Sequence, residues 1–165
     1  MISKKASIAT TSSAKCLAAS SSRPSIVFSR DDASGAGKAL AVPARIMIVE
    51  DDFLVASDME TALTEAGIEI AGVASSAEEA LAIAEAKRPT LAVMDIRLTG
   101  KRDGIDAALK LFGGFGIRCV FATAHCDEGT RARAQPANPI AWVPKPYAMA
   151  SLVEAVRRAL RDTNR

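Results

Sequence analysis

The chain has 165 residues, 49% of them hydrophobic, and a formal net charge of +2 at neutral pH, so one domain with a buried core is expected. No apolar run reaches the roughly 18 residues of a membrane span, so no membrane-spanning helix is expected. Residues 1–44 have a net charge of +4 and residues 45–165 a net charge of −2 without a basic stripe, which argues against nucleic-acid binding.

Residues 1–44 are rich in Ser, Ala and Thr and show neither a helical nor a strand period. Such a composition buries too little apolar surface to offset the entropy lost on ordering. We therefore expect a disordered N-terminal tail over residues 1–44 and a domain over residues 45–162, with the boundary near Pro43. The first thirty residues contain no acid, so a targeting segment stays open as an alternative.

From residue 45 onward, strand-like runs alternate with helical ones. In chain order, the first four are a strand RIMIVE (45–50), a helix DFLVASDMETALTEAG (52–67), a strand IEIAGVA (68–74) and a helix SSAEEALAIAEAKRP (75–89). Asp52 suits the cap of the first helix, and Gly67 suits the left-handed residue that ends it. The second helix begins at a serine cap and stops before Pro89.

The rest of the chain continues this alternation. It comprises a strand LAVMD (91–95), a helix IDAALKLF (105–112), a strand RCVFAT (118–123), a short strand AWV (141–143) and a helix AMASLVEAVRRALR (148–161). We expect Gly113 and Gly114 to end the helix over 105–112. The segment at 126–139 contains a glycine and two prolines, which leaves room only for a short helix or a mobile loop.

Strands that alternate with helices predict βαβ units, and hence a parallel sheet with helices on both faces. Five such repeats in about 120 residues fit an α/β fold with a doubly wound sheet of the flavodoxin-like order 2-1-3-4-5. In such sheets, ligands bind outside the carboxyl ends of the strands. Those ends are therefore where functional side chains are expected.

The predicted strands end on side chains of opposite charge. The first strand ends on Glu50 and Asp51, the third on Asp95 and the fourth on Thr123, and the fifth runs into Lys145. Several carboxylates at one edge of a sheet need a cation, and oxygen ligands that leave open water positions suit Mg²⁺. Asp52, which follows this group, is better explained as a helix cap than as a metal ligand.

Four short motifs occur at these strand ends in a specific order and spacing. They are VED (49–51), MDIRL (94–98), FATA (121–124) and PKPY (144–147). As a set, over about residues 45–162, they resemble the CheY-like receiver domain of two-component response regulators. The segment VFATAH also resembles in part a subgroup of receivers with a Phe-Ala-Thr-Gly motif. In this chain, Ala124 stands in place of the glycine.

The resemblance implies that Asp95 is the phosphoacceptor. It also implies that Mg²⁺ is held directly by Asp51 and Asp95, through water by Glu50, and by the backbone carbonyl of Arg97. A carboxylate can attack phosphorus only if the charges of both anions are screened, which the metal and a nearby ammonium would do.

The resemblance also implies a switch. Lys145 would pair with the phosphoryl oxygens, Thr123 would hydrogen-bond to them, and Trp142 stands at the position of the aromatic residue whose rotamer follows the threonine. Pro144, directly before Lys145, departs from the usual apolar residue and raises the question of whether the lysine backbone is shifted.

The leading hypothesis is therefore a stand-alone response regulator receiver in the cytoplasm, with Cys16, Cys119 and Cys126 as free thiols. It would not be an enzyme beyond its own phosphorylation and slow dephosphorylation. A histidine kinase, a phosphotransfer protein or a small phosphodonor would supply the phosphoryl group. The output would be a contact with a protein target through the face formed by residues 126–160, or removal of phosphoryl groups from a kinase.

Two alternatives compete with this hypothesis. One is a Mg²⁺-dependent phosphatase that forms an aspartyl-phosphate, but such hydrolases place a second aspartate where Arg97 stands. The other is a receiver-shaped binding module that is never phosphorylated, and the presence of all five chemical positions argues against it.

Overall fold

The structure is a computed structural model, and it describes residues 44–163 of the chain. The elements, in chain order, are β1 (Arg45–Val49), α1 (Phe53–Glu65), β2 (Glu69–Ala74), α2 (Ala77–Lys87), β3 (Leu91–Met94), α3 (Gly104–Phe115), β4 (Arg118–Thr123), α4 (Glu128–Ala134), a 3-10 turn (Gln135–Ala137), β5 (Ala141–Pro144) and α5 (Met149–Thr163). The predicted alternation of strands and helices is thus confirmed. The tail predicted over residues 1–44 falls, apart from residue 44, outside the described residues.

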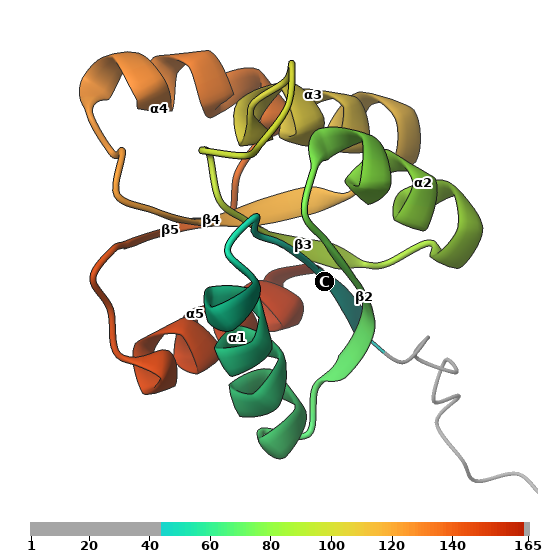
Figure 1. The fold of residues 1–165 in the computed structure, drawn as a ribbon, viewed down its shortest axis with the longest axis vertical. Coiled ribbons are helices and arrows are strands. Elements are labelled where there is room, and N and C mark those ends of the chain that lie inside the picture. Colours follow the sequence, from blue (N-terminus) through green and yellow to red (C-terminus); the bar gives the residue numbers. More distant parts are fainter. Residues whose placement is uncertain (1–43, 164–165) are drawn as a thin grey trace, which may run out of the picture. The chain divides into compact units, whose positions relative to one another are not determined.

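The five strands form one parallel sheet in the order β2-β1-β3-β4-β5, as predicted. Helices α1 and α5 cover one face of this sheet, and α2, α3 and α4 cover the other (Figure 1). None of the helices in the described part of the chain is long and apolar enough to cross a membrane. The order reverses between β1 and β3, and at such a point the loops after neighbouring strands diverge and leave room for a ligand.

Each face of the sheet packs against its own apolar core. Met47 and Val49 of β1 lie in the core beneath α2 and α3, while Ile46 and Ile48 lie in the core beneath α1 and α5. This division follows from the alternation of side chains along a strand. Because both faces are covered, the central strands are apolar except at their ends, where Arg45 and Arg118 begin β1 and β4 and Thr123 ends β4.

The helix ends follow the expected caps with one exception. The Asp52 carboxylate accepts hydrogen bonds from the first turn of α1, and the Ser76 hydroxyl accepts one from Glu79 in α2. The prediction that Gly113 and Gly114 end the third helix is wrong. Helix α3 runs through both glycines and ends at Gly116, whose φ of 69° lies in the left-handed region.

The physical reason for the longer helix is that a glycine inside a helix weakens it only modestly. What ends α3 is a left-handed residue whose amide donates back to Phe112, after which Ile117 enters the core. Of the two alternatives expected for the segment at 126–139, the structure contains the short helix, and α4 has seven residues.

Candidate functional site

Four strand ends place the candidate residues through backbone hydrogen bonds between neighbouring strands. The amide of Glu50 donates to the carbonyl of Ala74 at 3.0 Å, and that of Asp95 donates to Val49 at 2.9 Å. On the far side, the amide of Lys145 donates to the carbonyl of Thr123 at 3.0 Å. The sheet therefore fixes the backbone from which each of these side chains projects.

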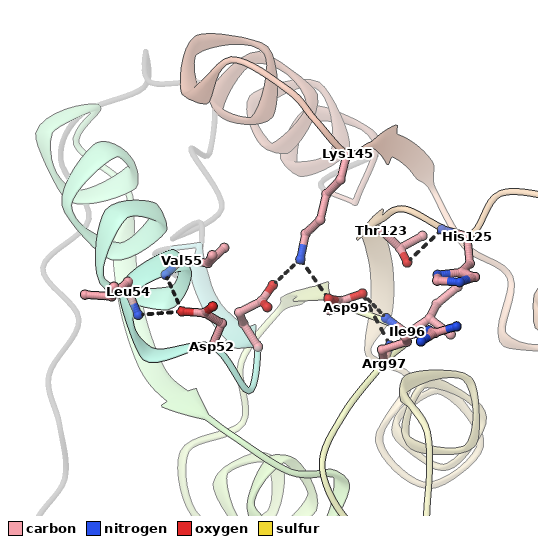
Figure 2. Close-up of polar contacts among 10 residues, drawn as sticks. Asp52, Leu54, Val55, Asp95, Ile96, Arg97, Thr123, His125 and Lys145 are labelled. Atoms are coloured by element: carbon pink, nitrogen blue, oxygen red, sulfur yellow. Dashed lines mark hydrogen bonds and ion pairs between the residues drawn. The ribbon is translucent and has the colours of Figure 1, made fainter.

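Lys145 connects the two buried carboxylates. Its Nζ lies 2.7 Å from Glu50 Oε2 and 2.7 Å from Asp95 Oδ2, so that one ammonium bridges both anions (Figure 2). The side chains of Glu50 and Asp95 are 3% and 10% exposed, whereas that of Lys145 is 23% exposed. Two carboxylates with so little access to water are stable in their charged form only with such a partner.

The pKa values of this cluster reflect burial and pairing. Burial raises the pKa of Glu50; the hydrogen bond from Lys145 lowers it in part, and the negative charge of Asp95 raises it again. Burial alone would lower the pKa of Lys145, but its hydrogen bonds to Asp95 and Glu50 and the negative charges of these two groups together outweigh that effect, so the pKa of Lys145 is raised. The ammonium is therefore charged at neutral pH.

Asp95 is held at both of its oxygens. While Oδ2 accepts from Lys145, Oδ1 accepts from the backbone amides of Ile96 at 2.6 Å and Arg97 at 3.3 Å (Figure 2). The carboxylate is therefore oriented before any ligand arrives, which removes one cost of forming a reactive geometry.

Sequence reasoning missed Gly104 as a structural part of this site. It is the first residue of α3; its amide donates to the carbonyl of Ile96 at 2.8 Å, and a Cβ added to it would overlap the backbone oxygen of Asp95. The start of α3 is thus packed directly onto the backbone of the candidate phosphoacceptor. In the sequence, the Asp103-Gly104 pair lies in a polar loop before a helical pattern, and nothing local indicates its contact with Asp95.

Glu50, Asp51 and Asp95 form the predicted group of carboxylates. One carboxylate oxygen from each lies within 4.8 Å of the other two. Two oxygens bound to one Mg²⁺ lie at most about 4.2 Å apart, because each metal–oxygen distance is about 2.1 Å. Small side-chain rotations would therefore suffice for a shared ion, and the hard, all-oxygen donor set fits Mg²⁺.

Thr123 and Trp142 lie in β4 and β5, outside the group of carboxylates. Thr123 is fully buried at the end of β4, and its Oγ1 accepts from the amide of His125 at 3.2 Å. Trp142 lies in β5 and stacks on Phe121 in β4, with 4.6 Å between the ring centroids. Thr123 thus borders the site, whereas Trp142 belongs to the surface beneath α4.

Three further positions that the sequence analysis named lie in loops or next to them. Arg97 follows Asp95 and is exposed, and its backbone amide contacts the carboxylate, while a metal-binding role for its carbonyl stays a prediction. Pro144 does not displace Lys145, because β5 is an edge strand and the lysine amide keeps its bond to Thr123. Asp52 points to the start of α1 as its cap (Figure 2).

Comparisons with known sequences agree with this geometry. Residues 46–157 match the family model of the response regulator receiver domain. The chain is 36% identical over 120 residues to the transcriptional regulatory protein PdtaR of Mycobacterium tuberculosis, which covers 73% of this chain and 58% of PdtaR. It is 36% identical over 135 residues to the phyllosphere-induced regulator PhyR of Methylorubrum extorquens, covering 79% and 49% of the two chains. The chain thus spans roughly half the length of these relatives.

Two solved structures are similar over the same region. The signal receiver domain of a modulated diguanylate cyclase from Desulfovibrio desulfuricans G20 is 33% identical with a TM-score of 0.66, covering 72% of this chain and 94% of that one. A CheY-like receiver domain protein from Methanospirillum hungatei JF-1 is 26% identical with a TM-score of 0.67, covering 73% and 95%. With the strand order and the family match, these findings show that the chain belongs to the response regulator receiver family.

Proposed function

We propose that Asp95 accepts a phosphoryl group in a Mg²⁺-dependent reaction and that the phosphorylated domain signals to a protein partner. The observation that supports this most directly is the bridging of Asp95 and Glu50 by Lys145, beside a third carboxylate from Asp51. This set combines a nucleophile, a fixed cation and an oxygen-rich metal site within one rim of the sheet.

In the proposed reaction, a carboxylate oxygen of Asp95 forms a bond to phosphorus. The bond from phosphorus to the donor breaks, and the donor leaves with the electron pair. Lys145 stabilises the charge on the phosphoryl oxygens, and the backbone amides of Ile96 and Arg97 keep the carboxylate in position. Asp51, Asp95 and the Arg97 carbonyl would hold Mg²⁺ directly, and Glu50 would hold it through water. The ion would screen the repulsion between the Asp95 carboxylate and the phosphoryl group.

The surface beside Lys145 supports a protein as the phosphodonor. Val55, Ala124 and Met149 line an open, mainly apolar pocket next to the lysine. Nearby in the first turn of α1, Phe53 and Leu54 are 79% and 73% exposed. An apolar rim around the reacting group suits a macromolecular partner, such as a histidine kinase or phosphotransfer protein in the cytoplasm, better than a small donor.

The output of the proposed switch would be a protein contact on the face formed by residues 126–160, or simple removal of phosphoryl groups from a kinase. Phosphorylation adds roughly −1.5 to −2 charges and three strong acceptors. Thr123, the last residue of β4, would donate its hydroxyl to such an acceptor. A phosphatase is the weaker candidate, because exposed Arg97 stands where its general acid would be.

Incubation with acetyl phosphate and MgCl₂ is expected to add one phosphoryl group, seen as a mass increase that is lost in alkali. Trp142 emission should change at the same time, because the proposed switch moves this side chain. Trp142 is the only tryptophan, so the emission comes from this residue. Asp95→Asn should show neither change, while the exposed Asp58→Asn should behave as wild type. Labelling of Asp95→Asn would contradict the proposal, and rapid continuous release of phosphate would favour the phosphatase.

Mg²⁺ is expected to raise the thermal midpoint of the wild-type protein. At tenfold excess over its dissociation constant, the ion should contribute about 1.4 kcal/mol to the free energy of unfolding. Asp51→Asn should weaken this response, because it removes a direct ligand. Asp52→Asn is the matched control, since its side chain caps α1 and asparagine can replace it there. An equal loss of response in both variants would contradict the proposed ligand set.

A further inference from the structure

Helix α4 is only lightly attached to the rest of the domain. It has seven residues, and among its side chains only that of Ala134 is buried. Two of its arginines make contacts across the surface. Arg133 pairs with Asp103 at the start of α3 at 2.9 Å, whereas Arg131 lies over the indole of Trp142. Of these two contacts, that of Arg131 reaches Trp142, whereas that of Arg133 ties the helix to α3.

Trp142 is held between a fixed partner and a movable one. The fixed partner is Phe121, which is fully buried in β4 and stacks on the indole at an interplanar angle of 26°. The movable partner is Arg131, whose guanidinium carbon lies 5.0 Å from the ring centroid and whose residue is exposed. The indole therefore contacts one residue of the core and one arginine of the short helix.

Arg131 is also tied to the loop that follows Thr123. Its Nε donates to the carbonyl of Cys126 at 3.1 Å. The thiol of Cys126 contacts the carbonyl of Thr123 at 3.6 Å, and the amide of His125 donates to the Thr123 hydroxyl oxygen at 3.2 Å. A continuous series of contacts thus runs from the Thr123 hydroxyl through the loop to Arg131 and on to Trp142.

We infer that Arg131 is a positioning residue that couples the state of Thr123 to the position of Trp142. The inference rests on the proposed function, since the event that it transmits is phosphorylation of Asp95. When the Thr123 hydroxyl turns to donate to a phosphoryl oxygen, the amide of His125 loses its acceptor. The loop then shifts, the Cys126 carbonyl moves away from Nε, and Arg131 releases the indole.

The strength of the contacts suits a reversible switch. A cation–π contact at an exposed site is weak, and so is a solvent-exposed hydrogen bond to a backbone carbonyl. Charge-assisted hydrogen bonds to a phosphoryl group are stronger. Phosphorylation can therefore outweigh the hold of Arg131 on Trp142, and loss of the phosphoryl group restores it.

The coupling can be tested first without phosphorylation, by acrylamide quenching of Trp142 emission in the full chain. Arg131→Met keeps the length of the side chain but removes the cation and the donor. We expect its quenching constant to exceed that of wild type by about two- to fivefold, the population change that an exposed cation–π contact supports. Arg133→Met, two residues along the same helix, is the matched control and should quench as wild type does.

Thr123→Val tests the other end of the series, because valine keeps the branched shape and removes the oxygen that His125 contacts. Quenching should rise in this variant, and the double variant Thr123→Val/Arg131→Met should quench no more than Arg131→Met alone. Such non-additivity is the signature of two residues that act through one series of contacts. Additive effects would overturn the coupling, even if each single variant quenched more strongly.

Phosphorylation with acetyl phosphate and MgCl₂ completes the test. Phosphorylated wild type should then be quenched nearly as strongly as Arg131→Met. Arg131→Met should also gain the phosphoryl group, as seen in its mass, but its quenching constant should change little. Arg131→Lys keeps a cation near the ring but cannot donate from Nε, so it should protect Trp142 and respond less to phosphorylation.

The outcomes separate this inference from the proposed function. If wild type gains no phosphoryl group, the proposed function fails, while the quenching of unphosphorylated Arg131→Met and of the double variant still decides the coupling. If wild type is phosphorylated but Arg131→Met quenches and responds as wild type does, the coupling through Arg131 is wrong and the proposed function stands.

Discussion

Metal-free Lys145→Met protein is expected to lose about 3 kcal/mol of unfolding free energy at neutral pH, as measured by urea denaturation in the presence of a chelator. The loss follows because Glu50 and Asp95 both bond to this ammonium at 2.7 Å and are almost inaccessible to water. Removing the cation leaves two adjacent buried anions without a partner. The value lies at the lower end of the usual range, because Lys145 itself is partly exposed.

The loss should depend on pH with a definite sign. The pKa of Glu50 is already raised above its ordinary 4.5 in the folded protein, chiefly by burial, and removal of Lys145 takes away a hydrogen bond that lowers it. A carboxyl group whose folded pKa is raised stabilises the fold below its unfolded pKa, and this contribution is lost as pH rises through the folded value. The variant should therefore approach wild type in stability as pH falls toward 4.5, the ordinary pKa of a glutamate.

Two comparisons make this prediction specific. Arg102→Met removes an ion pair of 2.9 Å with Glu78, but both partners are exposed, so the expected cost is below about 1 kcal/mol. Adding Mg²⁺ to Lys145→Met should recover part of the lost stability, because the ion replaces the missing positive charge. A loss that is the same at neutral and acidic pH would mean that the carboxylates are not the cause.

Gly104→Ala is expected to destabilise the protein by about 3 kcal/mol and to slow phosphorylation of Asp95. The new Cβ would overlap the backbone oxygen of Asp95, which cannot move aside as a flexible side chain would. Either α3 shifts outward and loses the hydrogen bond from the Gly104 amide to Ile96, or the backbone of Asp95 is displaced. Urea denaturation measures the first effect, and the rate of labelling by acetyl phosphate the second.

Gly113→Ala in the same helix is the matched control. A Cβ at Gly113 meets no atom within 4 Å, and alanine favours a helix over glycine. This variant should be more stable than wild type by about 0.5–1 kcal/mol and should be phosphorylated at the wild-type rate. If both glycine variants behaved alike, close packing at Gly104 would not be the reason for its presence.

The fold and most of the candidate site follow from local sequence. Apolar runs that stop at Glu50, at Asp95 and at Thr123 identify the carboxyl ends of three strands, and parallel strands bring those ends to one rim. Local hydrogen bonding likewise determines the start of α1 at Asp52 and the start of α2 at Ser76. Both kinds of feature depend on residues a few positions apart, which is why the sequence alone was sufficient for them.

The tertiary structure decided the features that depend on distances between remote segments. Helix α3 continues past Gly113 and Gly114 because it packs on the core, and neither glycine adopts the left-handed conformation that ends a helix. The need for glycine at 104 arises from the Asp95 backbone, and the role of Arg131 arises from Trp142, which lies in another element. Residue order determined which chemical groups reach the rim of the sheet, whereas packing in three dimensions determined which of them touch, because contact energies act only over a few ångströms.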